Sequence, residues 1–577
     1  MKKSLLCLGA IGLQLLTAQL VNAQSKTAIV GAGKAVDPYN YAIVKTAEFK
    51  NGSVSCAHPL ASMVGASIMK QGGNAFDAAI AVQFALAVVY PAAGNIGGGG
   101  FLVARTKEGK NISIDFRETA PGKATKDMYL DKDGNAITKL SKLGALANGV
   151  PGTVAGAFEI LKYAKLPIST LIQPAIDIAE FGFVISEKEA KGLNGTKESF
   201  VKNSTMPSAY VKETIWKTGD TLVNKDLAET LKRIRDNGQK GFYEGKTAQL
   251  IVDEMNRGNG IISLQDLKDY KAKSRTALQF DYKGYTIIGM PPPSSGGIII
   301  WQMMKMIENR NIAQYGFQSP KAVQLMIEVE RRAYADRAEH LGDPDFWKVP
   351  MKTLSDNTYL AKRMEDYDST KATPSKDIKA GTIHESNETT HISIFDKEGN
   401  MVSVTTTLNG GYGNRTVIGG AGFIMNNEMD DFSVKPGTPN MFGALGGTAN
   451  AIEPHKRMLS SMSPTLVLKN NKPYIVAGTP GGTTIPTSVF QTLVNMLEFN
   501  MNAEDAVNKP KFHHQWMPDQ VDFEPTFNKD TKTALEAMGY KMTPRAQLGR
   551  TEVIRILPDG KKETAADKRG DDSVAGY

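Results

Sequence analysis

Cysteine is almost absent from this chain of 577 residues, which excludes a fold built on disulfides. Cys7 lies in the N-terminal leader described below, so Cys56 has no partner for an intrachain disulfide. It ends the alternating stretch SVSC, and we predict a small buried side chain there rather than a nucleophile. Beyond the leader no stretch approaches 18 uninterrupted apolar residues, so no membrane-spanning helix is expected.

Basic stripes, repeats and low-complexity tracts are also missing. Lys and Arg (68) exceed Asp and Glu (60), but the two signs are interleaved, as in DKRGDD near the C-terminus, and no aromatic residues alternate with the basic ones. Nucleic acid is therefore not an expected partner. The 55 glycines occur in short runs without a period. The length allows either two domains or one large multilayer domain.

Residues 1–23 have the three parts of a secretory signal peptide: a basic start at Lys2 and Lys3, an apolar stretch over 5–16, and a small-residue cleavage site ending at Ala23. The apolar part is short for a membrane span, although a retained anchor is the alternative. Its removal takes away two lysines and no acid, so the formal charge falls from +8 to +6. We expect an exported protein with no membrane anchor after this removal, in the periplasm, with full secretion left open.

The pattern of predicted elements indicates an α+β fold. Helices are predicted over 59–71 and 75–89, and the region from about 149 to 387 is helix-rich. Strands follow from residue 390, in hairpins over 390–408 and 464–478, before a helix over 483–498. The run GNIGGGG (94–100) precedes a strand, not a helix, so it is no dinucleotide motif; its backbone must pass close to a substrate or to another chain segment.

Familiar catalytic motifs are missing: the sequence has no G-x-S-x-G elbow and no H-E-x-x-H. His513 and His514 are neighbours that would face opposite sides of a strand, so a shared metal is not expected. His391 lies near Thr389 and invites a hydroxyl–histidine pair. No acid lies nearby in the sequence to orient it, and we predict a structural role for all three histidines.

Thr389 offers a different chemistry if the chain is cut between Glu388 and Thr389. The new α-amine would have a pKa near 8 and could act as the base for the hydroxyl of the same residue. Residues 373–388, which precede the cut, are polar and are predicted to be exposed and flexible. Two threonines at the start of a strand are otherwise commonplace, so the pattern alone leaves both interpretations open.

The segment TTHISIFDKEGNMVSVTTTLNGGYG (389–413) resembles the signature of the γ-glutamyltranspeptidase family: T-[STA]-H, then G-N-x-V-[STA]-x-T-x-T-L-N, then [FY]-G. The similarity continues in GGNAFDAAIAV, GNIGGGGF, DFRETAP, NNEMDDFS, LSSMSPT, PGGT and FHHQW, and covers nearly the whole chain after the leader. It implies a four-layer αββα sandwich of the N-terminal-nucleophile hydrolase type, cut by itself into an associated large subunit (24–388) and small subunit (389–577).

The implied activity is hydrolysis of glutathione and other γ-glutamyl compounds, with transfer of the γ-glutamyl group to water, amino acids or dipeptides through a γ-glutamyl-threonine intermediate. No metal or cofactor is implied. The resemblance gives Thr389 as the nucleophile, Thr407 as its hydrogen-bond partner, and Gly481 and Gly482 as the oxyanion hole. The implied substrate-binding residues are Arg117, Ser460 and Ser461 for the α-carboxylate, and Asn409, Glu428 and Asp431 for the α-ammonium.

Three points qualify the resemblance. KPGTPNMFGALGG resembles a lid, with Phe442 as its aromatic gate, which suggests small γ-glutamyl compounds rather than long polymers. Met458 replaces a usual proline and DKR replaces a usual D-P-R; both are expected to affect packing. Two alternatives stay open: an acylase for glutaryl side chains, which needs no ammonium site, and a periplasmic solute-binding protein, which would be one uncut chain. Without the resemblance, Gly481 and Gly482 are equally well a turn.

Overall fold

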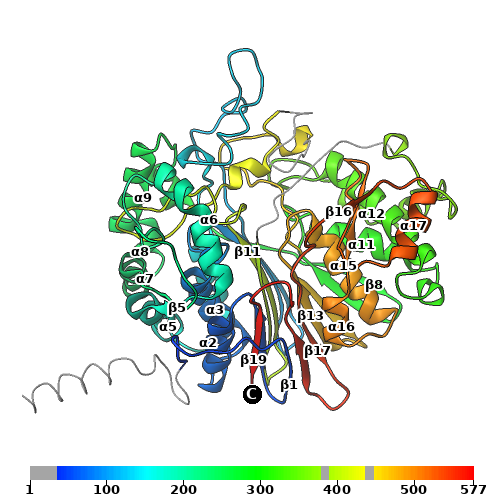
Figure 1. The fold of residues 1–577 in the computed structure, drawn as a ribbon, viewed down its shortest axis with the longest axis horizontal. Coiled ribbons are helices and arrows are strands. Elements are labelled where there is room, and N and C mark those ends of the chain that lie inside the picture. The colour runs from blue at the N-terminus through cyan, green and yellow to red at the C-terminus, as the bar shows by residue number, and fades with distance from the viewer. Residues whose placement is uncertain (1–35, 379–388, 436–446) are drawn as a thin grey trace, which may run out of the picture.

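The computed structural model describes residues 36–378, 389–435 and 447–577. Its centre is a pair of seven-stranded sheets, which are stacked on each other (Figure 1). The strands of the first sheet, in spatial order, are β1 (Thr46–Phe49), β18 (Lys562–Ala565), β17 (Glu552–Ile556), β13 (Lys472–Gly478), β12 (Thr465–Lys469), β9 (Tyr285–Gly289) and β8 (Leu278–Tyr282). Those of the second are β19 (Ser573–Gly576), β2 (Ser53–Cys56), β10 (Thr390–Phe395), β11 (Met401–Thr407), β3 (Gly99–Arg105), β4 (Asn111–Phe116) and β7 (Lys273–Arg275). Neighbouring strands in both sheets are antiparallel.

Successive side chains of a strand point to opposite faces of its sheet, so one sheet contributes apolar side chains to two layers of the core. In β3, Phe101 and Val103 belong to the cluster between the sheets, whereas Leu102 and Ala104 belong to the cluster beneath the helices. The cluster between the sheets also contains Met401 of β11 and, from the first sheet, Ile288, Leu466, Val476 and Ile554. Both faces of the central strands are therefore buried, which fits the near-continuous apolar run of β3, whereas β10 and β11 alternate apolar with buried polar side chains.

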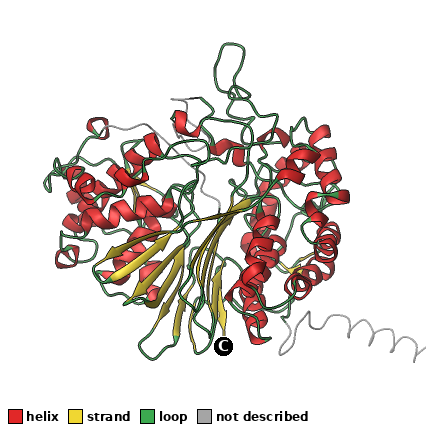
Figure 2. Cartoon of the chain, turned by 180° about the vertical axis from the view of Figure 1, so that it is seen from behind, coloured by secondary structure: helices red, strands yellow, loops and turns green. Residues whose placement is uncertain are grey.

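Helices cover the outer face of each sheet, as the views from front and back show (Figures 1 and 2). The second sheet shares its outer core with α2 (Pro59–Lys70), α3 (Ala75–Val89), α4 (Thr153–Ile160), α5 (Ile168–Phe181), α6 (Glu187–Asn203), α7 (Lys225–Asn237), α8 (Lys240–Tyr243), α9 (Gly245–Arg257) and α10 (Leu264–Asp269). The first sheet shares its outer core with α11 (Gly296–Ile307), α12 (Pro320–His340), α13 (Met351–Leu354), α14 (Asn357–Lys362), α15 (Thr484–Leu497), α16 (Ala503–Asn508) and α17 (Lys529–Ala537). The α+β class and the four-layer order are confirmed.

Two further small sheets lie outside this core: β14 (Phe512–His513) with β15 (Val521–Phe523) and β16 (Met542–Pro544), and β5 (Phe183–Val184) with β6 (Thr221–Leu222). The predicted early helices, both hairpins and the helix at 483–498 are confirmed within one or two residues. Strands β7, β8 and β9 in the helix-rich middle were not anticipated. The β8–β9 turn uses positive φ at Lys283 and Gly284, and lysine is no turn signal.

The expectation that residues 373–388 are exposed is wrong for the start of this segment. Ser375 is buried, not exposed: its N–H donates to Asp519 at 2.8 Å and its carbonyl accepts from the Trp516 indole at 2.8 Å. Residues 379–388 lie outside the described part of the chain. As expected, the backbone of residues 94–100 passes close to another chain segment. A Cβ on Gly98 would lie 2.0 Å from the carbonyl oxygen of Thr407.

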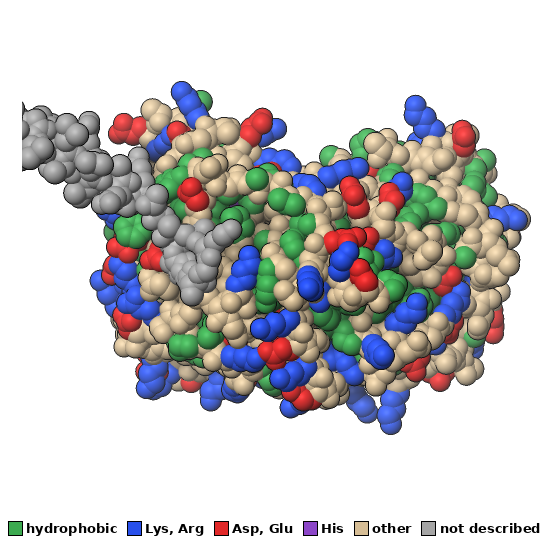
Figure 3. Space-filling model, turned by 90° about the horizontal axis from the view of Figure 1, so that it is seen from below, with side chains coloured by type: hydrophobic (Ala, Val, Ile, Leu, Met, Phe, Trp, Pro, Cys, Tyr) green, Lys and Arg blue, Asp and Glu red, His purple; other side chains and the backbone are tan. Residues whose placement is uncertain are grey.

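The surface carries mixed charge. On the face seen from below, Lys and Arg side chains are interspersed with Asp and Glu side chains (Figure 3). None of the helices in the described ranges combines the length and the apolar character that a bilayer crossing needs.

Candidate active site

Thr389 and Thr407 meet because of the register of one hairpin. β10 and β11 pair Thr390 with Thr406, so the preceding and following residues lie opposite each other, on the face that points toward the first sheet. Their hydroxyl oxygens are 3.5 Å apart, and both side chains are buried. The backbone N–H of Asn409, which has a φ of +70°, donates to the Thr407 hydroxyl at 2.8 Å. The Thr407 hydroxyl therefore has a fixed orientation toward Thr389.

Asn95 holds the end of β11 in this position, although the sequence did not single it out. Its side-chain amide donates to the carbonyl oxygen of Thr407 at 2.9 Å and to the Thr406 hydroxyl at 3.2 Å. Its side-chain oxygen accepts from the Gly98 N–H at 3.0 Å and from the Thr153 hydroxyl at 2.7 Å. The sequence signal that could have identified Asn95 is its position as a polar side chain inside the glycine-rich run GNIGGGG.

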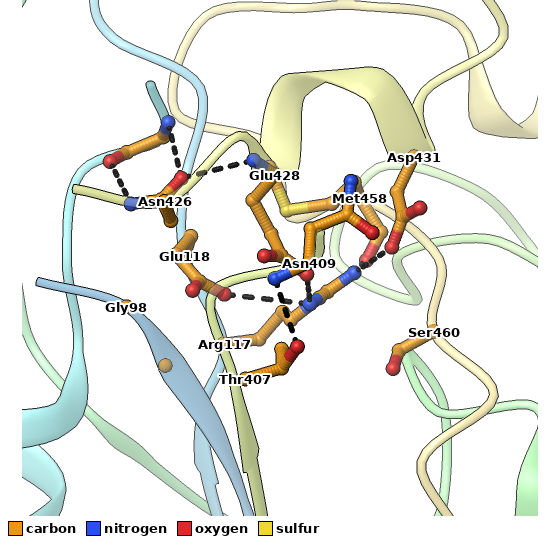
Figure 4. Close-up of polar contacts among 12 residues, drawn as sticks. Gly98, Arg117, Glu118, Thr407, Asn409, Asn426, Glu428, Asp431, Met458 and Ser460 are labelled. Carbon is orange, nitrogen blue, oxygen red and sulfur yellow. Dashed lines mark hydrogen bonds and ion pairs between the residues drawn. The ribbon is translucent and has the colours of Figure 1, made fainter. Parts of the chain in front are cut away.

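Arg117 follows the last residue of β4 and lies in a buried cluster of charges (Figure 4). Its guanidinium forms ion pairs with Glu428 and Asp431, which begin and end one 3₁₀ turn, and lies 3.4 Å from Glu118. It also donates to the carbonyl oxygens of Met458 and Leu459, each at 3.3 Å. One cation is thus surrounded by three acids in a space shielded from water.

This excess of acid has an electrostatic consequence. Burial raises the pKa of Glu118 to about 7; the charges of Asp431 and Asp115 act in the same direction, whereas Arg117 lowers it. The arrangement is complementary to a ligand that carries one cation and one anion. An ammonium could replace the guanidinium as partner of Glu428 and Asp431, and a carboxylate could replace those acids as partner of Arg117. Glu118 was missed by the sequence reasoning, although it follows Arg117 directly.

Ser460 and Ser461 are buried on the loop that supplies the Met458 and Leu459 carbonyls. The Ser460 carbonyl accepts from the N–H and the hydroxyl of Ser295, at 2.7 and 2.8 Å, and its hydroxyl accepts from the Met462 N–H at 3.2 Å. Figure 4 shows Ser460 on the side of Arg117 where Asp431 also lies. Met458 contributes its backbone carbonyl to Arg117, so its side chain can differ from proline without altering that contact.

Gly481 and Gly482 form the turn before α15, with φ of +139° and +59°. A Cβ on Gly481 would lie 2.5 Å from the Thr484 hydroxyl, so the tight turn requires glycine there. Thr389 and Gly481 line the same cavity, whose volume is about 410 Å³. The N-terminus of α15 is close to it, and its dipole favours negative charge in this region.

The three histidines are structural, as predicted. His391 is buried between the sheets and bonds the hydroxyls of Thr405 at 2.9 Å and Ser393 at 3.1 Å, not that of Thr389. Burial lowers its pKa to about 3. His513 bonds Thr487 at 2.8 Å, while His514 lies 3.3 Å from Asp519. Over residues 36–378, 389–435 and 447–577 no group of three or more metal-binding side chains occurs.

The remaining expectations have mixed outcomes. Cys56 is buried at the end of β2, as predicted. In DKRGDD, Arg569 forms ion pairs with Glu524 and Asp567, and the N–H of Lys568, which stands where the proline is usual, donates to the Asn508 side-chain oxygen at 3.1 Å. Glu388, Phe442 and the leader at 1–23 lie outside the described residues.

Solved structures share the fold of this chain. The structure of cephalosporin acylase from Bacillus halodurans covers 95% of this chain, which in turn covers 99% of that one, with a TM-score of 0.82 and 26% identity. The fold is therefore that of the N-terminal-nucleophile hydrolases.

The family follows from the sequence comparison. A model described as gamma-glutamyltranspeptidase matches residues 61–577. The glutathione hydrolase proenzyme of Escherichia coli (strain K12) is 47% identical over 534 residues, 92% of each chain. The structure of Helicobacter pylori gamma-glutamyltranspeptidase is 46% identical, covers 56% of this chain and 93% of that one, and has a TM-score of 0.54. The chain belongs to the gamma-glutamyltranspeptidase family.

Proposed function

We propose that this protein cuts itself at Thr389 and then hydrolyses glutathione and other γ-glutamyl compounds, or transfers their γ-glutamyl group to amino acids and dipeptides. The observation that carries the proposal is the buried pair of Thr389 and Thr407 beside a charge cluster complementary to an α-amino acid. Membership of the family supports the same chemistry.

Maturation begins with attack of the Thr389 hydroxyl on the Glu388 carbonyl carbon. The peptide nitrogen leaves as the free amine of Thr389, an ester forms, and water opens it. The products are the associated subunits 24–388 and 389–577, after export to the periplasm removes residues 1–23. The Thr389 amine, with an ordinary pKa near 8, then takes the proton of its own hydroxyl.

In the catalytic cycle the donor's α-carboxylate binds Arg117, Ser460 and Ser461, and its α-ammonium binds Glu428, Asp431 and Asn409. The Thr389 oxygen attacks the γ-carbonyl carbon and expels the donor's amine, which takes up the proton. The N–H groups of Gly481 and Gly482 stabilise the oxyanion. Water or an acceptor amine releases the glutamyl ester. No step needs a metal or cofactor.

A glutaryl acylase is the second candidate, favoured by the fold shared with cephalosporin acylase. A glutaryl group has a carboxylate for Arg117 but no ammonium. It would leave Glu428 and Asp431 buried without a cation once Arg117 turns to the substrate, which is costly. The three acids around Arg117 therefore favour a γ-glutamyl substrate.

The experiment is a denaturing gel of wild type, Thr389→Ala and Thr389→Ser, with N-terminal sequencing of the small band. Wild type should give two bands, the smaller beginning at Thr389 and hydrolysing a γ-glutamyl anilide. Thr389→Ser should split more slowly at the same bond. Thr389→Ala should remain one chain; if it splits between 388 and 389, the self-cleavage mechanism is wrong.

A further inference from the structure

The cavity beside Thr389 has a charge opposite to that of the donor cluster. The residues that line it include Thr389, Gly481, Tyr90, Arg545 and Arg550. Among the described residues of its lining there are two arginines and no acid. None of the six residues assigned to glutamyl binding belongs to that lining. The cavity and the charge cluster are therefore separate compartments: Thr389 lines the cavity, and its partner Thr407 lies beside the cluster (Figure 4).

Acyl transfer requires a space beside the nucleophile for the leaving amine and for the acceptor amine. When Thr389 attacks a γ-glutamyl amide, the glutamyl part extends toward Arg117 and the amine leaves on the other side of the carbonyl carbon. By microscopic reversibility, an acceptor amine must return along the path by which the first amine left. Leaving group and acceptor therefore occupy one space. The volume of about 410 Å³ is within the range of pockets that bind small molecules.

Arg550 is the better anchored of the two arginines. One guanidinium nitrogen donates to the Tyr90 hydroxyl at 2.7 Å, and the guanidinium carbon lies 5.1 Å from the centre of the Tyr90 ring. A second nitrogen lies 3.1 Å from a carboxylate oxygen of Asp572, which is buried. The Arg550 side chain is 13% exposed, against 26% for Arg545, whose partner is Asp522.

The acidic side chains near Arg550 do not fully neutralise its positive charge. Glu552 and Asp572 are both fully buried and interact with each other. Burial raises the pKa of both carboxyls, that of Glu552 well above its usual value, and the nearby Asp567 acts in the same direction, so negative charge is disfavoured behind Arg550. A guanidinium has five donors in a planar fork, so it can bind a carboxylate while keeping such contacts.

We infer that Arg550, held by Tyr90 and Asp572, binds the carboxylate of the leaving group and of the acceptor, and so selects amino acids and peptides with a free C-terminus. This inference rests on the proposed function. Arg550 is a specificity-determining residue in this inference, and a donor whose leaving group has no carboxylate, such as an anilide, acylates Thr389 without it.

The experiment compares substrates that differ only at that carboxylate. Donors are glutathione and its C-terminal amide; acceptors are glycylglycine and glycylglycinamide, with a γ-glutamyl anilide as donor and acceptor concentrations corrected to equal free amine. Wild type should prefer each carboxylate over its amide by about tenfold or more in kcat/KM, the worth of a charge-assisted hydrogen bond. In Arg550→Gln the ratio should fall to within about twofold of one.

Arg545→Gln is the matched control, because Arg545 lines the same cavity, and it should keep the wild-type ratio. If Arg550→Gln fails to mature, Arg550→Lys replaces it and should give a ratio between the two. The inference is overturned if wild type shows no carboxylate preference, if the Arg550 variants keep it, or if Arg545→Gln removes it. Failure of the proposed function looks different: wild type would not hydrolyse the anilide at all.

Discussion

Replacing Asp431 by asparagine should separate γ-glutamyl from glutaryl substrates. The change nearly preserves shape and removes one of the two acids proposed to receive the α-ammonium. A charge-assisted hydrogen bond in a buried site is worth roughly 1.5–3 kcal/mol, so kcat/KM for a γ-glutamyl anilide should fall about ten- to a hundred-fold. Arg117 keeps Glu118 and Glu428 as partners, so the fold and self-cleavage should survive.

The matched glutaryl anilide should show no such loss. Without an ammonium, this substrate leaves Asp431 facing methylene groups, and removing that charge should leave kcat/KM unchanged or raise it. The assay is kcat/KM for both anilides on wild type and mutant, with a gel to confirm equal maturation. Asp430→Asn is the control: Asp430 lies on the same turn and is buried, but it accepts from the Ser141 hydroxyl at 2.5 Å. Equal losses for both anilides in Asp431→Asn would refute the ammonium assignment.

Three other changes have defined outcomes. Arg117→Lys keeps the charge but cannot pair with a carboxylate in a fork while also reaching the Met458 carbonyl, so KM for the anilide should rise about ten- to a hundred-fold while self-cleavage persists. Thr407→Val removes the hydroxyl next to Thr389 at constant shape; kcat should fall about tenfold or more with KM little changed, and Thr407→Ser should restore it. His391 has its pKa lowered by burial to about 3 from 6.5, so it contributes stability that is present above pH 6.5 and lost as pH falls toward 3. Between pH 7 and pH 5 the free energy of unfolding of wild type should therefore fall by about 2 kcal/mol more than that of His391→Asn. Denaturant titrations of both proteins at the two pH values measure this difference.

The local parts of the site could be predicted from the sequence because they depend on short-range rules. The period-two alternation of 390–408 and the turn DKEGN fix the hairpin register, and the register alone puts Thr389 opposite Thr407. Two glycines before a helix predict a tight turn with exposed N–H groups, and a small apolar cysteine that ends the strand-like stretch SVSC is predicted to be buried. These features need no information from distant segments.

The sequence by itself also indicated early helices followed by strand hairpins after residue 390, and hence the α+β class, although it missed strands β7, β8 and β9. Tertiary structure decided what the strands bring together. Arg117 lies 311 residues from Glu428 and 341 from Met458, and Tyr90 lies 460 residues from Arg550. These contacts form because two sheets, each apolar on both faces, bury their shared layer only when stacked, and stacking carries the ends of β4, β11 and β13 to one place. Alternation says which face a side chain takes, but not which distant charge it will meet there.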